Sequence, residues 1–104
     1  MKLPMTWLTI VSYRDFYDIP RLILASDREQ RFWVLDSTFD EDQDEYSTSY
    51  SIYFAGDDLH QAREKLESLV QGGSLDASQV LPISSFEFDG TNRAKLRLIS
   101  PAED

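Results

Sequence analysis

The chain has 104 residues, no cysteine, and 19 acidic against 10 basic side chains, which gives a formal net charge of −9. The length suits one domain over residues 1–104, and the lack of cysteine excludes disulfides and thiolate chemistry, as expected of a protein in the reducing cytoplasm. A negative charge of this size disfavours nucleic acid and anionic membranes and favours cationic partners.

The first third of the chain predicts three strands. Residues 6–13 are rich in β-branched and aromatic residues, as is typical of a strand. Residues 14–21 interrupt this pattern with aspartates and a proline. Residues 21–26 and 31–36 then flank the polar stretch 27–30 and predict a hairpin. Both arms are apolar on both faces, so we expect them at the centre of the sheet.

The segment at residues 13–21 also places three aromatic side chains among charged ones. Tyrosine and arginine are over-represented at binding hot spots, so this segment is a candidate binding site. The structural alternative is that the aromatic rings close one end of the sheet while Arg14 pairs with Asp18. We favour the structural interpretation.

The middle of the chain carries almost the whole charge imbalance. Between Arg31 and Arg63 there are eight acidic residues and no lysine or arginine, and five of the acids fall within residues 40–45. The field of such a segment attracts cationic proteins and ions. We therefore expect a solvated loop between two strands that forms the candidate partner-binding site.

The spacing of Asp40, Asp42 and Asp44 resembles the start of a calcium loop, in which alternate carboxylates converge on one cation. The rest of that template fails. Glu45 stands at the sixth position, where the turn requires glycine, and Ser51 stands at the twelfth, where a bidentate glutamate is expected. We therefore predict no specific metal site.

Residues 46–54 alternate strictly and predict a half-exposed strand. Tyr46, Tyr50 and Phe54 fall on one face and Tyr53 on the other. Tyrosines beside the acidic run are candidate anchors for a partner. The predicted partner-binding residues are Asp40, Glu41, Asp42, Asp44, Glu45, Tyr46, Tyr50 and Tyr53.

Residues 58–71 predict the one long helix, because apolar residues recur there with helical spacing. These residues are Leu59, Ala62, Leu66, Leu69 and Val70. Asp57 or Asp58 caps the first turn, Arg63 and Glu67 are spaced for a weak pair, and Gly72-Gly73 ends the helix.

His60 is the only histidine, and helical spacing places it on the polar face with Glu64 and Glu67. A zinc site there would depend on carboxylates for its other ligands. A catalytic triad would need a nucleophile in an elbow motif, which the sequence lacks. We therefore predict no catalytic residue and no cofactor.

Two further elements are expected towards the C-terminus. Residues 74–82 predict a short helical turn that ends at Pro82. Residues 84–88 and 91–99 flank Asp89-Gly90, a strong hairpin signal. We expect residues 100–104 to form a frayed tail.

In the last predicted strand, Arg93, Lys95 and Arg97 share one face. We interpret them as protection of an edge strand, because cationic side chains discourage pairing between sheet edges. A small anion site and pairing with the acidic segment are the alternatives.

These elements predict an α+β fold that is mostly β, in the order β-β-β-β-α-β-β. The sheet is expected to be a curled antiparallel sheet or a small open barrel, with one covering amphipathic helix. No part of the chain carries the motifs of a family specific enough to name.

The function that the sequence favours is a non-enzymatic protein-binding module whose acidic segment engages a basic partner. Inhibitors and toxin-neutralising proteins share this composition, although composition is a weak warrant. One alternative is a small hydrolytic enzyme that uses paired carboxylates, such as Asp36 with an acid of the loop. The other is a homo-oligomeric structural protein with the aromatic strand as its interface.

Overall fold

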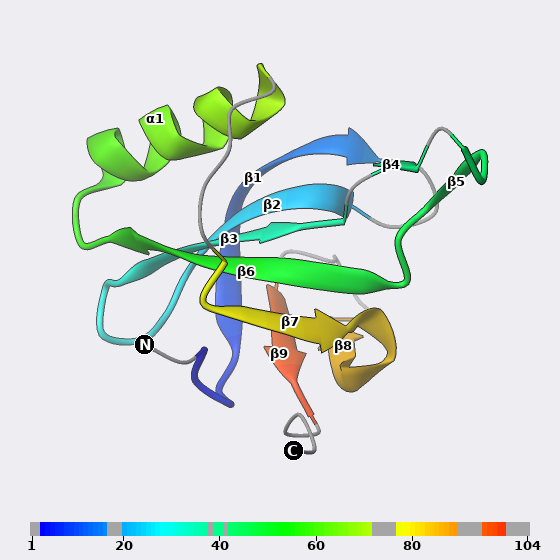
Figure 1. The fold of residues 1–104 in the computed structure, drawn as a ribbon. Helices are drawn as coiled ribbons and strands as arrows, with labels where there is room; N and C mark the ends of the chain where they lie inside the picture. Colours follow the sequence, from blue (N-terminus) through cyan, green and yellow to red (C-terminus); the bar gives the residue numbers. More distant parts are fainter. Residues whose placement is uncertain are drawn as a thin grey trace.

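The structure, a computed structural model, describes residues 3–16, 20–37, 39–40, 42–71, 77–89 and 95–99; for a few of these, Tyr46 among them, only the backbone is described. The strands are β1 Leu8–Phe16, β2 Pro20–Ser26, β3 Phe32–Asp36, β4 Phe39–Asp40, β5 Glu45–Tyr46, β6 Ser49–Gly56, β7 Gln79–Pro82, β8 Phe86–Phe88 and β9 Lys95–Leu98. The helices are α1 Leu59–Val70 and the 3-10 helix η1 Ile83–Ser85. Within the described residues, seven antiparallel strands form one sheet in the order β7-β6-β3-β2-β1-β9-β8, and β4 pairs with β5 in a separate ribbon (Figure 1). The predicted α+β, mostly β fold is confirmed.

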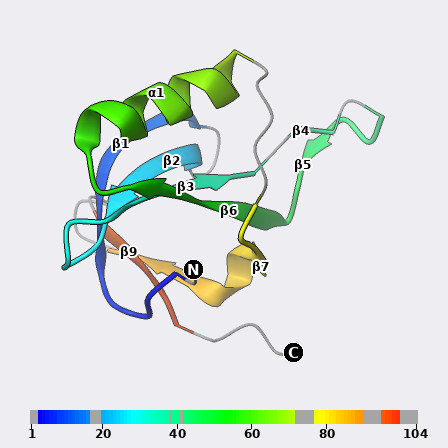
Figure 2. The same ribbon diagram turned by 60° about the vertical axis from the view of Figure 1, so that its left-hand side comes forward.

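The main sheet curls so far that its two edge strands, β7 and β8, come close to each other (Figures 1 and 2). They stand at opposite ends of the strand order, yet only the three residues of η1 connect them. The N–H of Ile83 donates to the carbonyl of Thr48, just before β6, at 2.9 Å, and the carbonyl of Ser85 accepts from the N–H of Ile99, just after β9, at 2.8 Å. The sheet is therefore the curled half-barrel that the element order predicts, with η1 bridging its two sides.

The inner face of the half-barrel holds the larger of two apolar cores. Trp33 and Tyr50 are fully buried there. Edge-to-face ring contacts join Trp33 to Phe54 at 5.1 Å and Tyr50 to Phe86 at 5.4 Å between ring centres. Such contacts fix ring orientation as well as burying area.

Helix α1 covers the opposite, outer face of β2, β3 and β6 and forms the second core (Figure 1). Ala62 and Leu66 are buried there, and Leu69 packs at the margin. Leu59 and Val70 remain exposed, so the buried stripe of the helix is narrower than its apolar spacing predicts. Because cores lie on both faces of β2 and β3, their predicted central position is confirmed.

The first turn of α1 is capped by Asp58, the second of the two candidates. Its Oδ1 accepts from the N–H of His60 at 2.8 Å and of Gln61 at 3.4 Å. An N-cap carboxylate satisfies N–H groups that have no partner within the helix and favourably meets the positive end of the helix dipole. The predicted stop at Gly72-Gly73 lies outside the described residues.

Asp27 closes the predicted hairpin between β2 and β3. Its buried carboxylate accepts from the N–H of Glu29 and of Arg31, from Nε of Arg31, and from the indole N–H of Trp33, at 2.8 to 3.1 Å. Burial acts to raise the pKa of Asp27, but these hydrogen bonds outweigh burial and hold its pKa below the ordinary value. Gln30 adopts a left-handed conformation with φ of 64° in this turn.

Strand β1 is longer than predicted and runs through residues 14–16, where we expected an interruption. A register shift between Ile10 and Ser12 changes which residues face the barrel, and beyond it Arg14 lies opposite Leu22. After such a bulge the apolar residues of the strand switch to the other face of the sheet, so the alternation of apolar and polar residues is broken. The sequence pattern therefore does not reveal that one strand continues.

The helical turn predicted within residues 74–82 is absent from residues 77–82, and residues 74–76 lie outside the described residues. Residues 79–82 form β7, paired with β6, and the 3-10 turn follows Pro82. Because β7 is an edge strand of the sheet, a proline at its end removes no obligatory ladder bond.

Strand β9 is not an edge strand, contrary to our interpretation of its basic face. It pairs with β8, so the predicted pairing of the two segments is present, but Phe88 lies opposite Leu96 and the N–H of Asp89 donates to the carbonyl of Lys95 at 2.9 Å. The chain therefore does not turn tightly at Asp89-Gly90 as predicted. Strand β9 also pairs with β1 through Leu8 opposite Leu96. The second pairing joins the two ends of the chain, and no local pattern indicates it. Arg93 and residues 100–104 lie outside the described residues.

Candidate partner-binding site

The acidic run folds as a small hairpin, not as an open loop. Strands β4 and β5 pair through Asp40 opposite Glu45, and we call residues 39–46 the acidic hairpin. It extends away from the main sheet at the end where β3 stops (Figure 1). Asp42, Asp44 and Glu45 are exposed, so the hairpin presents carboxylates to solvent.

The conformation of Asp44 helps the hairpin to turn. Its φ of 56° lies in the left-handed region, which aspartate and asparagine adopt more readily than most residues other than glycine. Asp44 therefore contributes to the turn conformation of the hairpin as well as to its negative charge.

A buried arginine holds the base of the acidic hairpin. Arg21 donates from one guanidinium nitrogen to Oγ of Ser37 at 3.1 Å and to the carbonyl of Ser47 at 3.4 Å. Ser37 also donates from its hydroxyl to the Ser47 carbonyl at 2.9 Å and from its backbone to the Arg21 carbonyl at 2.7 Å. These bonds join the residues on either side of the hairpin to β2.

Sequence reasoning missed this contact, and it also misjudged the strand that follows. Residues 46–54 were predicted as one strand, but β5 ends at Tyr46 and β6 begins at Ser49. The carbonyl of Ser47 is used by Arg21 and Ser37, and its hydroxyl accepts from the N–H of Ser49 at 3.1 Å. Local bonds of this kind compete with a strand ladder. The only signal in the sequence was a lone arginine at the start of an otherwise apolar arm.

The predicted tyrosine anchors do not all reach the surface. Tyr50 is fully buried in the inner core, so its ring is not accessible to a partner and we remove it from the candidate site. Tyr53 is half-buried beside the helix core, and burial together with the negative charge of Asp36 raises its pKa. β6 is therefore not the half-exposed strand that we predicted, because the helix covers part of its outer face.

The remaining predicted site residues are only partly described. The backbone of Asp40 and Tyr46 is placed, and Glu41 lies outside the described residues. The part of the chain that the structure describes holds no group of three His, Asp or Glu side chains positioned for a metal ion.

Besides Arg21, the aromatic segment at residues 13–21 contributes a contact of Arg14 with the helix. Arg14 pairs with Glu67 of α1, with N···O of 2.5 Å, and both side chains are partly exposed. Glu67 was predicted to pair with Arg63 along the helix. The predicted pairing of Arg14 with Asp18 lies outside the described residues.

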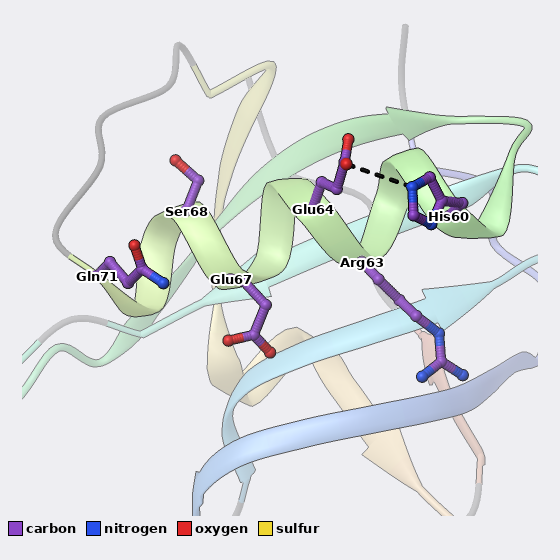
Figure 3. Close-up of a pocket in the computed structure, with 6 residues that line it drawn as sticks. All are labelled: His60, Arg63, Glu64, Glu67, Ser68 and Gln71. Carbon is purple, nitrogen blue, oxygen red and sulfur yellow. Dashed lines mark ion pairs between the residues drawn. The ribbon is translucent and has the colours of Figure 1, made fainter.

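A cavity of about 500 Å³ lies along the polar side of α1 (Figure 3). Its lining residues are His60, Arg63, Glu64, Glu67, Ser68 and Gln71. His60 pairs with Glu64 at 3.3 Å, whereas Glu67 points away from them in Figure 3. Ser68 is eight residues from His60, which is roughly 12 Å along a helix axis, so the two cannot form a nucleophile–base pair.

Comparisons with protein-family models, with curated proteins and with solved structures gave no match. None of the helices in the described part of the chain is long and apolar enough to cross a membrane.

Proposed function

We propose that this chain is a non-enzymatic protein-binding module whose acidic hairpin engages a basic protein partner. The observation that carries the proposal is the placement of Asp42, Asp44 and Glu45, all exposed, on a hairpin that extends from the sheet. The Arg21 contacts at its base support a fixed orientation, which reduces the ordering cost of binding.

Electrostatic attraction is the main contribution that the acidic hairpin can make. Charges summed over a projecting segment speed the encounter with an oppositely charged partner, and salt screens them within roughly 8–10 Å at physiological ionic strength. With Tyr50 in the core, few apolar anchors accompany the carboxylates. We therefore propose a salt-sensitive interaction of the kind made by inhibitors and toxin-neutralising proteins, in the cytoplasm.

The test compares two variants that lose the same amount of charge at different places. One carries Asp42→Asn, Asp44→Asn and Glu45→Gln in the acidic hairpin. The control carries Glu29→Gln, Asp57→Asn and Glu64→Gln, which are exposed acids elsewhere on the surface. Both are used with the wild type to capture proteins from the native cell lysate at low and at high salt.

We expect a basic protein to bind the wild type and the control at low salt, to bind the hairpin variant much less, and to be released at high salt. With the captured protein purified, the hairpin variant should lower the association rate constant more than it raises the dissociation rate constant. Equal recovery by the wild type and the hairpin variant would show that the acidic hairpin is only a solubilising segment.

A further inference from the structure

A small basic cavity lies on the outer face of β1 and β9, apart from the acidic hairpin. Its volume is about 280 Å³, and the described residues that line it are Trp7, Thr9, Arg28 and Lys95. An indole ring, a hydroxyl and two cations thus surround one hollow, without a carboxylate among them. In a chain with a net charge of −9, this local excess of positive charge is unusual.

The pairing of β1 with β9 places the residues that line the cavity next to one another. Thr9 lies opposite Lys95, and Leu8 lies opposite Leu96 with both leucines in the inner core. Because side chains alternate along a strand, Trp7, Thr9 and Lys95 therefore face outwards. Arg28 comes from the β2–β3 turn that Asp27 holds.

The ring of Trp7 is held in place while much of it remains exposed. The guanidinium carbon of Arg97 lies 4.7 Å from the centre of the Trp7 ring, and Nε of Arg97 donates to Glu87 at 2.9 Å. Trp7 is nonetheless 37% exposed. A fixed aromatic ring offers contact area to a ligand at low entropic cost.

The two cations of the cavity differ from their neighbours in their pairing. Arg97 pairs with Glu87, and Arg31 pairs with Asp27. Neither Arg28 nor Lys95 forms an ion pair with another residue of the described part of the chain, and both are exposed. Their charges are therefore available to a ligand.

A second hollow of about 240 Å³ adjoins the first, because Arg28 lines both. Pro4, Thr6 and Arg31 line it as well, together with the carboxylates of Asp27 and Glu29, both of which pair with Arg31. A carboxylate of a ligand is therefore expected in the first hollow, between Arg28 and Lys95, and not in the second. Each hollow is smaller than a usual small-molecule site of roughly 300–1,000 Å³, but the two lie side by side. An extended peptide places alternate side chains on one face about 7 Å apart, which suits two neighbouring shallow hollows.

We propose that this surface, which we call the Trp7 surface, binds an extended acidic segment of a partner protein. A carboxylate of that segment lies between Arg28 and Lys95, and an apolar side chain packs on Trp7. Nucleic acid fits less well, because a long polyanion would meet the net negative charge of the rest of the molecule. The proposal is independent of the function proposed above, since it concerns a different surface of opposite charge.

The test uses the two indole N–H signals in a proton–nitrogen NMR spectrum, assigned with a Trp7→Phe variant. The backbone amide signals of α1, whose residues line neither hollow, serve as the internal control. The probe is the capped hexapeptide of sequence DSLSDS, in which Asp, Leu and Asp share one face when the chain is extended, and its matched control is the neutral peptide NSLSNS. We expect saturable shifts of the Trp7 signal with the acidic peptide alone, unmoved amide signals of α1, and weaker binding at high salt.

Two matched protein variants locate the site. Arg28→Gln with Lys95→Gln should weaken peptide binding roughly tenfold, whereas Arg63→Gln with Lys65→Gln, which removes the same charge from α1, should leave it unchanged. Circular dichroism and thermal unfolding show that each variant is folded. The proposal would be overturned if the neutral peptide bound equally well, or if an oligothymidylate or inorganic phosphate bound more strongly than the acidic peptide. It would also be overturned if the Trp7 signal shifted with protein concentration alone.

Discussion

The guanidinium of Arg21 donates to the hydroxyl of Ser37 across 3.1 Å in the interior of the protein. The hydroxyl of Ser37 in turn donates to the carbonyl of Ser47. Ser37 and Ser47 flank the acidic hairpin, and both are therefore hydrogen-bonded to the buried side chain of Arg21. The orientation of the hairpin therefore depends on a residue that lies outside it. A partner that recognises the hairpin would depend on Arg21 without touching it.

Replacing Arg21 with lysine should lower the free energy of unfolding and loosen the acidic hairpin. Lysine keeps the charge but lacks the planar fork, so the Ser37 and Ser47 oxygens lose donors at a cost of about 1–3 kcal/mol. Urea denaturation measures the first effect, and amide hydrogen exchange over residues 39–47 measures the second. Arg63→Lys, on the exposed face of α1, should change stability by less than about 0.5 kcal/mol. Unchanged stability and unchanged exchange would show that Arg21 does not hold the hairpin.

The carboxylate of Asp27 should make stability depend on pH in the acid range. Its pKa is lower in the folded protein than the ordinary aspartate value of 3.8, so its contribution is complete above that value. The contribution is lost as the pH falls through the folded pKa, because protonation then favours the unfolded chain. Asp27→Asn should lower the free energy of unfolding at pH 7 by about 1–3 kcal/mol and flatten the acid limb of the stability curve. Urea denaturation at a series of pH values tests this, with exposed Asp57→Asn as the control. Parallel acid limbs in wild type and Asp27→Asn would contradict it.

The two aspartates that precede α1 should differ in their effect on stability. Asp58→Ala removes the acceptor of two N–H groups and should cost about 1 kcal/mol, whereas Asp57→Ala should cost little. Thermal unfolding followed by circular dichroism at the helix minimum compares the two variants directly. Equal losses would mean that the charge near the helix dipole matters more than the cap.

Calcium should not stabilise the protein selectively. A ligand that binds only the native state raises the melting temperature, so a specific site in the acidic hairpin would reveal itself in a melting curve. We expect millimolar calcium and magnesium to shift melting equally, by screening repulsion among the carboxylates. A larger shift with calcium, abolished by Asp42→Asn, would establish a metal site.

Several elements of this protein could be predicted from the sequence because their causes are local. Periodic apolar residues and an aspartate cap specify α1, and a polar turn between two apolar arms specifies the β2–β3 hairpin. The pairing of β8 with β9 was also predicted, although its register does not place the turn at Asp89-Gly90. The order of these elements was enough to predict a mostly β fold with a curled antiparallel sheet. The acidic hairpin was also predicted as the exposed part of the chain, because clustered carboxylates are costly to bury.

The tertiary structure alone decided which side chains are available. Tyr50 and Tyr53 were both predicted as partner anchors on opposite faces of one strand, yet curling of the sheet buries Tyr50 completely while Tyr53 stays partly exposed beside α1. Arg21 meets Ser37 and Ser47, and Trp7 meets Lys95, only because strands distant in the chain pair with one another. Local patterns determine which residues form a helix or a strand. Contacts between strands that are distant in the chain depend instead on the packing of the whole sheet. Both proposed binding surfaces depend on contacts of this second kind.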